Sequence, residues 1–368
     1  MVLAVLLAVL PVFLGLGSFS IWLSRALVFL VASCPCAMVI SVPLGFYAGI
    51  GKASKLGVLI KGGKYLEALA KADTFIFDKT GTLTTGKLSL NSIETKGNLT
   101  KNQVLALAAS SEINSNHPAA IAIKESAKDL KLPVLTNYSE IAGIGVKAMY
   151  NNQEVICGNY RILHSEDCDK YAIYLTIDGI LQGKFTVSDT IRKEALSVIT
   201  KLKSLGITTL AMLTGDNDAI AKDIAQKAGL DGYQAGLLPQ DKITAFEKIA
   251  KGTNGICMFA GDGINDAPLL ARADVGIAMG GVGSDAAIEA ADAVLMTDDI
   301  SRIASAIRIA RGTRKIIVQN IALALGVKLI VLTVAAFGAV PMWLAIFADV
   351  GVALLAVANA ARAVMIKA

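Results

Sequence analysis

The sequence predicts a membrane protein in which α-helical transmembrane segments flank a cytoplasmic α/β region. Hydrophobic residues make up 54% of the 368 residues, and the mean hydropathy is +0.58, above that of an ordinary soluble domain. Charge is unevenly distributed, because Arg25 is the only charged side chain within residues 1–51. Residues 65–300, in contrast, have a soluble composition and alternate short apolar runs with amphipathic stretches, which is an α/β pattern.

Four apolar segments account for the predicted contact with a lipid bilayer. Residues 1–17 and 21–49 precede the soluble region, and residues 317–338 and 342–364 follow it. A transmembrane helix needs about 20 apolar residues. We interpret the first segment as a membrane span rather than a cleaved signal, because no basic region precedes it. Lysines and arginines next to the soluble region place that region in the cytoplasm, and they account for the net charge of +5 without a nucleic-acid partner.

The stretch TFIFDKTGTLT, residues 74–84, contains the candidate nucleophile. Its first four residues suit a buried strand of a parallel sheet, and Asp78 follows at the carboxyl end, where open α/β sheets bind their ligands. A carboxylate in this place can attack phosphate and form an aspartyl phosphate. Lys79 and the backbone amides around Thr80 can offset charge on the transferred group.

The DKTGTLT motif resembles the phosphorylation motif of P-type ATPases. The resemblance implies a HAD-like (haloacid dehalogenase-like) doubly wound parallel sheet as phosphorylation domain, with an inserted α+β nucleotide-binding domain. It also implies ATP as substrate, an aspartyl phosphate at Asp78 and a bacterial plasma membrane as location. A soluble phosphatase of the same superfamily is the nearest alternative, but it would carry an acid two residues after the nucleophile, where this chain has Thr80.

A second loop, Thr-Gly-Asp-Asn, follows the apolar run 207–213. In P-type ATPases the corresponding loop lies beside the phosphorylated aspartate. The resemblance therefore implies that Thr214, Gly215 and Asp216 contact phosphate oxygens. It likewise matches Lys242, in the sequence LPQDK, to the lysine that reaches the phosphoryl group.

A third loop, GDGINDAP, follows the next apolar run and suggests a Mg²⁺ site. Two carboxylates four residues apart beside an anionic site suit Mg²⁺, which binds through one or two carboxylates, phosphate oxygens and water. We expect Asp262 to be a direct ligand, together with Asp78, and Asn265 and Asp266 to orient water, phosphate or the loop. The resemblance adds the backbone carbonyl of Thr80.

The predicted insert, residues 88–186, has its own set of motifs. The sequence SEINSNHP resembles the nucleotide-binding element of heavy-metal P-type ATPases, and two glycine-containing motifs follow it. Glycines allow a nucleotide to approach the backbone closely. The residues implied in nucleotide binding are Glu112, His117, Pro118, Gly143, Gly145, Gly158 and Asn159.

Cys34-Pro35-Cys36 lies within the second apolar segment and predicts a transport site. On a regular helix, side chains two residues apart point about 200° apart, so the two thiols would not face one ion. Pro35 breaks the helix and lets both sulfurs converge. Thiolates select soft or borderline ions such as Zn²⁺, Cd²⁺, Pb²⁺ or Cu⁺.

Lys328 and Asp349 lie in the last two apolar segments, where charged side chains are rare and typically functional. We expect them to pair. Asp349 would join the two cysteines around a divalent ion, and Lys328 would act as its counter-ion when the metal leaves. This set resembles the zinc, cadmium and lead exporters. A Cu⁺-transporting P-type ATPase is the alternative, although its typical Tyr-Asn and Met-Ser-Ser sets are absent from these segments.

No Thr-Gly-Glu sequence occurs in the chain. In the family, this loop of the actuator domain positions the water that hydrolyses the aspartyl phosphate. We therefore expect the chain to bind ATP and accept phosphate but not to complete turnover alone, and a separate chain carrying the actuator domain is a candidate partner. The alternative is a truncated membrane protein that binds nucleotide or metal without pumping.

These features predict a division of the chain into consecutive parts. The parts are residues 1–51, two transmembrane helices with the CPC motif; 52–87, a stalk and the first part of the phosphorylation domain; 88–186, the nucleotide-binding domain; 187–300, the second part of the phosphorylation domain; and 301–368, a basic stalk and two transmembrane helices.

Overall fold

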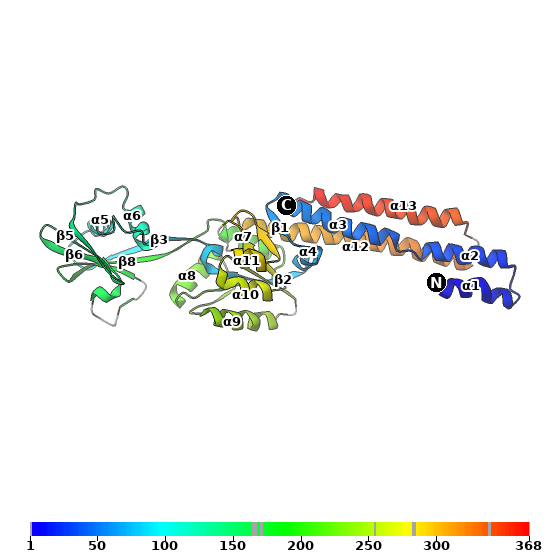
Figure 1. Cartoon of the computed structure of the whole chain (residues 1–368), viewed down its shortest axis with the longest axis horizontal. Helices are drawn as coiled ribbons and strands as arrows, with labels where there is room; N and C mark the ends of the chain where they lie inside the picture. Colours follow the sequence, from blue (N-terminus) through cyan, green and yellow to red (C-terminus); the bar gives the residue numbers. More distant parts are fainter. Residues whose placement is uncertain are drawn as a thin grey trace. The chain divides into compact units, whose positions relative to one another are not determined.

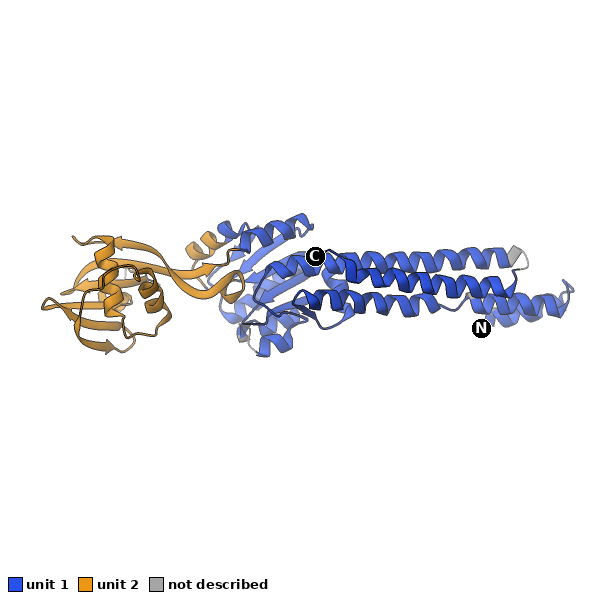
Figure 2. Cartoon of the chain, turned by 90° about the horizontal axis from the view of Figure 1, so that it is seen from above, with its two compact units in different colours: residues 1–78, 194–215, 225–368 blue, residues 79–193, 216–224 orange. Residues whose placement is uncertain are grey.

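The computed structural model describes residues 2–163, 168–169, 172–253, 255–281, 285–337 and 340–367. The chain divides into two compact units (Figure 2). Unit 1 comprises residues 1–78, 194–215 and 225–368, and unit 2 comprises residues 79–193 and 216–224. Each unit is built on one β-sheet, and unit 1 also contains the apolar helices.

The apolar helices of unit 1 are α1 (Val2–Phe13), α2 (Phe19–Ala32), α3 (Cys36–Lys55), α12 (Ser301–Phe337) and α13 (Met342–Ala361). Helices α3, α12 and α13 lie side by side (Figures 1 and 2). Among the described residues, the stretches long and apolar enough to cross a membrane are Phe19–Lys55, Ser301–Ala335 and Met342–Met365. Position 338, the last of one predicted segment, lies outside the described residues.

Helix α1 is shorter than the span predicted over residues 1–17. It has 12 residues and is about 18 Å long, whereas a hydrocarbon core is about 30 Å thick. The chain turns after it at Gly15 and Gly17, whose φ angles are 71° and 136°, values that glycine adopts readily. Over the described residues, α1 is therefore shorter than the hydrocarbon core is thick.

The predicted helix break at Pro35 is confirmed. Helix α2 ends at Ala32 and α3 begins at Cys36, although the two together form one apolar stretch. Pro35 has no backbone N–H to donate, and its ψ of 33° departs from helical geometry. The helix is therefore interrupted between Ala32 and Cys36.

Helix α3 packs against α12 through small residues. Ser41, Gly45 and Gly49 are buried and recur every four residues, so they share one face of the helix. A Cβ added to Gly45 would lie 3.0 Å from Cγ1 of Ile317, and one added to Gly49 would lie 2.9 Å from Cγ2 of Thr313. Larger side chains at these glycines would push the two helices apart.

The sheet of unit 1 has seven strands in the order β1-β13-β12-β11-β2-β9-β10. Their bounds are β1 (Val58–Ile60), β2 (Ala72–Asp78), β9 (Thr209–Leu213), β10 (Gly232–Gln234), β11 (Ile256–Gly261), β12 (Val275–Met279) and β13 (Ala293–Leu295). All neighbours pair in parallel except β1 with β13. The predicted parallel sheet is therefore confirmed, with β2 between β9 and β11.

Helices surround this sheet (Figure 1). They are α4 (Gly63–Ala70), α7 (Ala195–Ser204), α8 (Asp218–Ala228), α9 (Pro239–Lys251), α10 (Ala267–Arg272) and α11 (Asp285–Ala290), and the short turn η3 (Ile264–Asp266) precedes α10. A second short turn, η4 (Arg362–Met365), follows α13 and contacts α3 and α12. Ile76 and Phe259 pack with residues of α9, α10 and α11. Phe75 and Phe77 alternate with Ile76 and stack on each other at 4.2 Å, so the core extends to both faces of the sheet.

Arg311 of α12 contacts the backbone at the start of β2. Its guanidinium donates hydrogen bonds to the carbonyl oxygen of Leu205, at the end of α7, and to that of Ala72, with 3.2 Å between Nη2 and the Ala72 oxygen. Ala72 is the first residue of β2, and Asp78 is the last. One side chain of a membrane helix therefore holds the strand that carries the candidate nucleophile.

Unit 2 contains a six-stranded antiparallel sheet in the order β3-β8-β7-β6-β5-β4. Its elements are η1 (Lys79–Leu83), β3 (Thr84–Thr95), α5 (Lys101–Ser111), α6 (Pro118–Ser126), β4 (Thr136–Ile141), β5 (Gly145–Tyr150), β6 (Gln153–Gly158), η2 (Tyr160–Leu163), β7 (Ala172–Ile177) and β8 (Ile180–Ile191). Val104, Ile123, Val155 and Phe185 belong to its apolar core. The long strands β3 and β8 extend this sheet beyond the predicted interval 88–186.

Candidate functional site

Asp78 lies at the carboxyl edge of the parallel sheet of unit 1. It pairs in register with Leu213, the last residue of β9, and on its other side β11 ends at Gly261. Thr214 and Asp262 directly follow these two strands. Because the carboxyl ends of parallel strands meet at one edge, the predicted loops gather beside Asp78.

Three carboxylates meet at this edge. Oxygen atoms of Asp78, Asp262 and Asp266 all lie within 4.8 Å of one another. Asp78 and Asp266 are 4% and 2% exposed. Lys242, near the start of α9, pairs with both, and its Nζ lies 3.4 Å from Oδ1 of Asp266. Clustered carboxylate oxygens of this kind fit Mg²⁺, the metal suggested by the sequence.

The electrostatics of the cluster favour a bound cation. Burial raises the pKa of Asp78, the charge of Asp266 adds to the increase and Lys242 opposes it, and the resulting pKa is about 7. Burial by itself lowers the pKa of Lys242, but Asp78 and Asp266 outweigh burial, and the pKa is raised. A cation among these carboxylates would favour ionised Asp78, which is the nucleophilic form.

Asp266 organises the loop after β11. Its Oδ2 accepts a hydrogen bond from the backbone amide of Gly263 at 3.3 Å, while Oδ1 faces Lys242. A Cβ on Gly261 would lie 2.8 Å from the Asp266 side chain, so this position favours glycine. Asn265 is exposed. These contacts agree with an orienting role for Asp266.

The loop after β9 is held by β10 and the chain beyond it. The amide of Thr214 donates to the Gln234 carbonyl at 3.0 Å, and its own carbonyl accepts from the amide of Leu237 at 3.1 Å. Thr214 is buried, and a Cβ on Gly215 would lie 3.2 Å from the Leu237 oxygen. These two hydrogen bonds fix the backbone of the loop, and its contact with phosphate stays a prediction.

Within unit 2, Lys79 pairs with Asp216, and Nζ lies 2.6 Å from Oδ2. The Lys79 side chain is only 7% exposed. Arg192 supports the η1 turn, because its Nε donates to the Thr82 carbonyl at 2.9 Å and its Nη2 to the Gly81 carbonyl at 2.8 Å. The two predicted phosphate-site residues Lys79 and Asp216 are thus direct partners, which the sequence did not indicate.

The remaining residue of the DKT motif, Thr80, has an exposed side chain. Its backbone is extended, with φ of −73° and ψ of 130°, and Gly81 follows with a φ of 70°. Glycine is favoured there because the left-handed region excludes most side chains. The role of the Thr80 carbonyl as a metal ligand stays a prediction.

Most of the predicted nucleotide-binding residues line one cavity of unit 2. This cavity has a volume of about 340 Å³, and the predicted residues around it are Glu112, His117, Gly143, Gly145, Gly158 and Asn159. Ser115 and Glu140 also line it, and they contribute with His117 to a neighbouring cavity of about 460 Å³. Pro118 instead begins α6 as its first residue.

His117 caps the amino end of α6. Its Nδ1 accepts a hydrogen bond from the backbone amide of Ala119 at 3.3 Å. In the neutral ring the proton is then on Nε2, which remains able to donate. The cap therefore fixes the ring beside the cavity in one tautomer.

The glycines act through the backbone of this sheet. Gly145 of β5 lies opposite Gly158 of β6, and a Cβ on Gly158 would lie 3.1 Å from the Gly145 Cα and would meet the Ile144 carbonyl oxygen. Gly143 has a φ of 69°, and its carbonyl accepts from Nδ2 of Asn159 at 2.9 Å. The close approach of β5 and β6 therefore favours glycine at positions 145 and 158, and the positive φ of the turn favours glycine at position 143. The side-chain amide of Asn159 stabilises this turn.

Glu112 has polar partners that the sequence analysis did not identify. It is 7% exposed, and the side chains of Ser115 and Cys157 lie near its carboxylate. Burial raises its pKa, and these two neighbouring side chains oppose the increase. Ser115 lies within the SEINSNHP motif, and Cys157 directly precedes Gly158. Their positions next to predicted nucleotide-binding residues were the sequence signal that could have indicated them as neighbours of Glu112.

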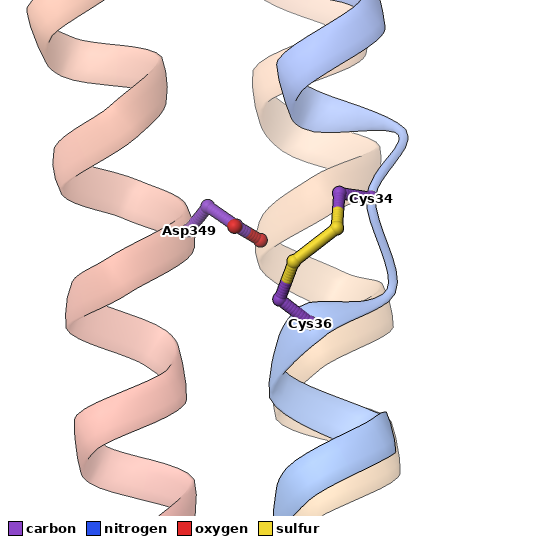
Figure 3. A group of neighbouring side chains, drawn as sticks. All are labelled: Cys34, Cys36 and Asp349. Carbon is purple, nitrogen blue, oxygen red and sulfur yellow. A yellow bond between two sulfur atoms is a disulfide. The ribbon is translucent and has the colours of Figure 1, made fainter.

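The predicted transport residues also come together. Atoms of Cys34, Cys36 and Asp349 able to bind a metal lie within 4.8 Å of one another, and Asp349 points from α13 towards the cysteines (Figure 3). Nζ of Lys328 lies 3.6 Å from Oδ1 of Asp349, so the expected pair is present. A cavity of about 10 Å³ beside this pair is lined by residues of α12 and α13.

In contrast to the predicted pair of thiolates, Cys34 and Cys36 form a disulfide, with 2.11 Å between their sulfurs. The break at Pro35 brings both sulfurs to one place, as the motif predicted, and the two sulfurs are bonded to each other. A disulfide has no thiolate to offer a metal. The reduced form is therefore the one that can bind an ion.

Comparisons with known proteins agree with this geometry. Residues 72–274 match the family of haloacid dehalogenase-like hydrolases. The chain is 47% identical to a zinc-transporting ATPase of Synechocystis sp. over 96% of its length and 50% of the relative's. It is 46% identical to a cadmium, zinc and cobalt-transporting ATPase of Bacillus subtilis over 100% of its length and 54% of the relative's. The chain thus spans about half the length of these relatives.

A solved structure is similar over almost the whole chain. The crystal structure of a zinc-transporting PIB-type ATPase in the E2.Pi state superposes with a TM-score of 0.89 at 35% sequence identity. The match covers 99% of this chain and 61% of that chain. The similarity therefore includes both units and the apolar helices.

Proposed function

Because this chain belongs to the haloacid dehalogenase-like hydrolases and, among them, to the heavy-metal-transporting P-type ATPases, we propose that it uses ATP to drive export of a divalent heavy-metal ion. The meeting of Asp78, Asp262, Asp266 and Lys242 at one sheet edge is the observation that most supports this function. The transported ion would bind in the membrane at Cys34, Cys36 and Asp349.

In the proposed reaction, a carboxylate oxygen of Asp78 attacks the γ-phosphorus of ATP, the bond to the β-phosphate oxygen breaks and ADP leaves. Asp78, Asp262 and the carbonyl of Thr80 would hold Mg²⁺, which would offset negative charge on the transferred group. Lys242 neutralises the buried carboxylates before transfer and faces the phosphoryl group after it. The cavity lined by Glu112 and His117 would hold the nucleotide base.

The cargo is proposed to be Zn²⁺ or Cd²⁺, with Pb²⁺ as a further substrate. Two thiolates and a carboxylate provide negative charge, and they combine soft sulfur ligands with a harder oxygen ligand, which suits such divalent ions. The relatives from Synechocystis and Bacillus subtilis, a zinc-transporting and a cadmium, zinc and cobalt-transporting ATPase, favour these ions over Cu⁺. The direction is out of the cytoplasm of a bacterial cell, across its plasma membrane.

Release of phosphate requires a further group. Position 80 holds threonine where a soluble phosphatase would have its acid, so we expect the aspartyl phosphate to be long-lived. The proposed source of the hydrolytic group is an actuator domain. A membrane protein that binds nucleotide or metal without pumping remains the second candidate.

Labelling with γ-³²P-ATP tests the proposal. The reduced chain, with Mg²⁺ and Zn²⁺, should acquire acid-stable, hydroxylamine-sensitive label that Asp78→Asn abolishes and Asp129→Asn, at an exposed aspartate, preserves. Incorporation should decrease when Zn²⁺ is chelated. A folded wild-type chain that binds ATP but takes no label under any of these conditions would support the non-pumping alternative instead.

A further inference from the structure

Helices α12 and α13 face each other through a row of residue pairs that ends at the proposed ion site. The pairs are Asn320 with Ala356, which share a hydrogen bond, Ala324 with Val352, which belong to one apolar cluster, and Lys328 with Asp349, which form the ion pair. The three α12 residues recur every four positions and therefore share one face of that helix. The numbers fall along α13 as they rise along α12, so the helices are antiparallel and in one register.

The ion pair at the end of this row is not fixed by a hydrogen bond between its two charged groups. Nζ of Lys328 lies 3.6 Å from Oδ1 of Asp349, and within the described part of the chain neither of these buried atoms has a hydrogen-bond partner. A charge interaction at this distance has little directional preference. A slip of one residue along an α-helix moves a side chain by about 1.5 Å and turns it by about 100°. The geometry of the pair therefore depends on how α12 and α13 are held together.

A chain of side-chain hydrogen bonds joins the two helices at the other end of the row. Asn320 is 0% exposed, and its Nδ2 donates to the carbonyl oxygen of Ala356 at 2.9 Å. Its Oδ1 accepts from Nδ2 of Asn359 at 2.8 Å, and Oδ1 of Asn359 accepts from Nη1 of Arg362 at 2.7 Å. Arginine only donates and a backbone carbonyl only accepts, so the direction of every bond in the chain is fixed. Both polar atoms of the buried Asn320 side chain are thus paired with α13.

We propose that Asn320 is a positioning residue for the ion site, because its hydrogen bonds to α13 hold the register that places Lys328 beside Asp349. This inference rests on the proposed function, in which Lys328 pairs with Asp349 when the metal leaves. A buried amide without partners is costly, so a shifted register of the two helices would leave the Asn320 side chain unsatisfied. A single buried asparagine is known to specify register in paired helices in this way. The register set at Asn320 acts about 12 Å further along α12, at Lys328.

Loss of these hydrogen bonds has a definite direction of effect on metal binding. Asp349 belongs to α13, which also packs against α3, the helix that begins at Cys36. A looser contact with α12 therefore displaces Lys328 from Asp349 more than it displaces Asp349 from the cysteines. The carboxylate then has a weaker competing cation, so Zn²⁺ binds more tightly and leaves more slowly. A purely structural role for Asn320 would instead weaken Zn²⁺ binding.

The experiment measures Zn²⁺ binding to the reduced full chain in detergent. Isothermal titration calorimetry gives the Kd, and stopped-flow mixing with a chelator gives the dissociation rate. Asn320→Leu removes both hydrogen bonds at similar size, and it is measured alone and combined with Lys328→Met. Thr333→Val is the matched control, because the Thr333 hydroxyl donates to the carbonyl oxygen of Leu329 in the same helix. Thermal melting reports on folding, and Asn359→Ala, which removes the donor to Asn320, replaces Asn320→Leu if that variant does not fold.

Asn320→Leu should lower the Kd for Zn²⁺ about three- to fivefold and slow dissociation by a similar factor, whereas Thr333→Val should change neither. Combined with Lys328→Met, it should change the Kd by less than about twofold, because the lysine that Asn320 positions is already absent. Weaker or unchanged binding in Asn320→Leu, or an equal gain with and without Lys328, would overturn the inference. If neither wild type nor Lys328→Met binds Zn²⁺, the proposed ion site itself fails, and this inference fails with it.

Discussion

Replacing the candidate nucleophile Asp78 with asparagine should stabilise the metal-free protein above neutral pH. The side chain is 4% exposed and lies among the carboxylates of Asp262 and Asp266, and its pKa is raised to about 7. Lys242 pairs with it but does not fully offset burial and the neighbouring charges. An uncharged amide of nearly the same shape removes the ionisation, and Lys242 keeps Asp266 as a partner.

The sign and size of the effect follow from the difference in proton binding. An aspartate in the unfolded chain has a pKa of about 3.9, so between about pH 4 and 7 the folded state holds a proton that the unfolded state has lost. The free energy of unfolding therefore falls by about 1.4 kcal/mol per pH unit as pH rises through this range. Above pH 7 the full loss, on the order of 4 kcal/mol, is present, and below pH 4 it is absent.

Thermal unfolding of the reduced chain in detergent with EDTA, from pH 5 to 8.5, measures this effect. We expect Asp78→Asn to unfold roughly 5–10 °C above wild type at pH 8 and to approach wild type towards pH 5. Adding Mg²⁺ at pH 8 should raise the unfolding temperature of wild type more than that of the variant. Asp129→Asn, at an exposed side chain, is the matched control. A difference that does not change with pH, or a variant less stable than wild type at pH 8, would refute the reasoning.

The remaining predictions concern the membrane site and the nucleotide cavity. Lys328→Met frees Asp349 from its competing cation, so Zn²⁺ should bind about tenfold more tightly by calorimetry; unchanged affinity would exclude a counter-ion role. Oxidising Cys34 and Cys36 to their disulfide should remove the Zn²⁺ that the reduced chain binds, measured as ions bound per chain. Zn²⁺ binding retained after oxidation would contradict the two cysteines as ligands. Gly158→Ala crowds the β5–β6 pair and should lower stability by about 1–3 kcal/mol and weaken ATP binding; a melting curve like that of wild type would show that the strands can adjust.

The position of the candidate nucleophile was predictable because parallel strands give strong local signals. A short apolar run followed by polar loop residues identified the ends of β2, β9 and β11, and the sheet then brought Asp78 close to Asp262. Family resemblance supplied the expected order of motifs. The sequence did not show that Lys242 reaches both Asp78 and Asp266, because this depends on how α9 packs against the sheet.

Contacts without a periodic or motif signal were not predictable. Cys157 reads in sequence as an ordinary core residue, and only the packing of β6 against the end of α5 brings its thiol to Glu112. The pairing of Lys79 with Asp216 joins residues far apart in sequence for the same reason. The length of α1 depended on positive φ angles at Gly15 and Gly17, which composition does not reveal.

The continuity of α12 has a mechanical consequence. The helix runs without proline from Ser301 to Phe337 and carries both Arg311, which grips the start of β2, and Lys328, which faces Asp349. These two side chains are about 25 Å apart along a single hydrogen-bonded rod. One continuous helix therefore contacts both the strand that ends in Asp78 and the Lys328–Asp349 pair. Under the proposed function, a rotation of α12 that separates Lys328 from Asp349 would also displace the start of β2.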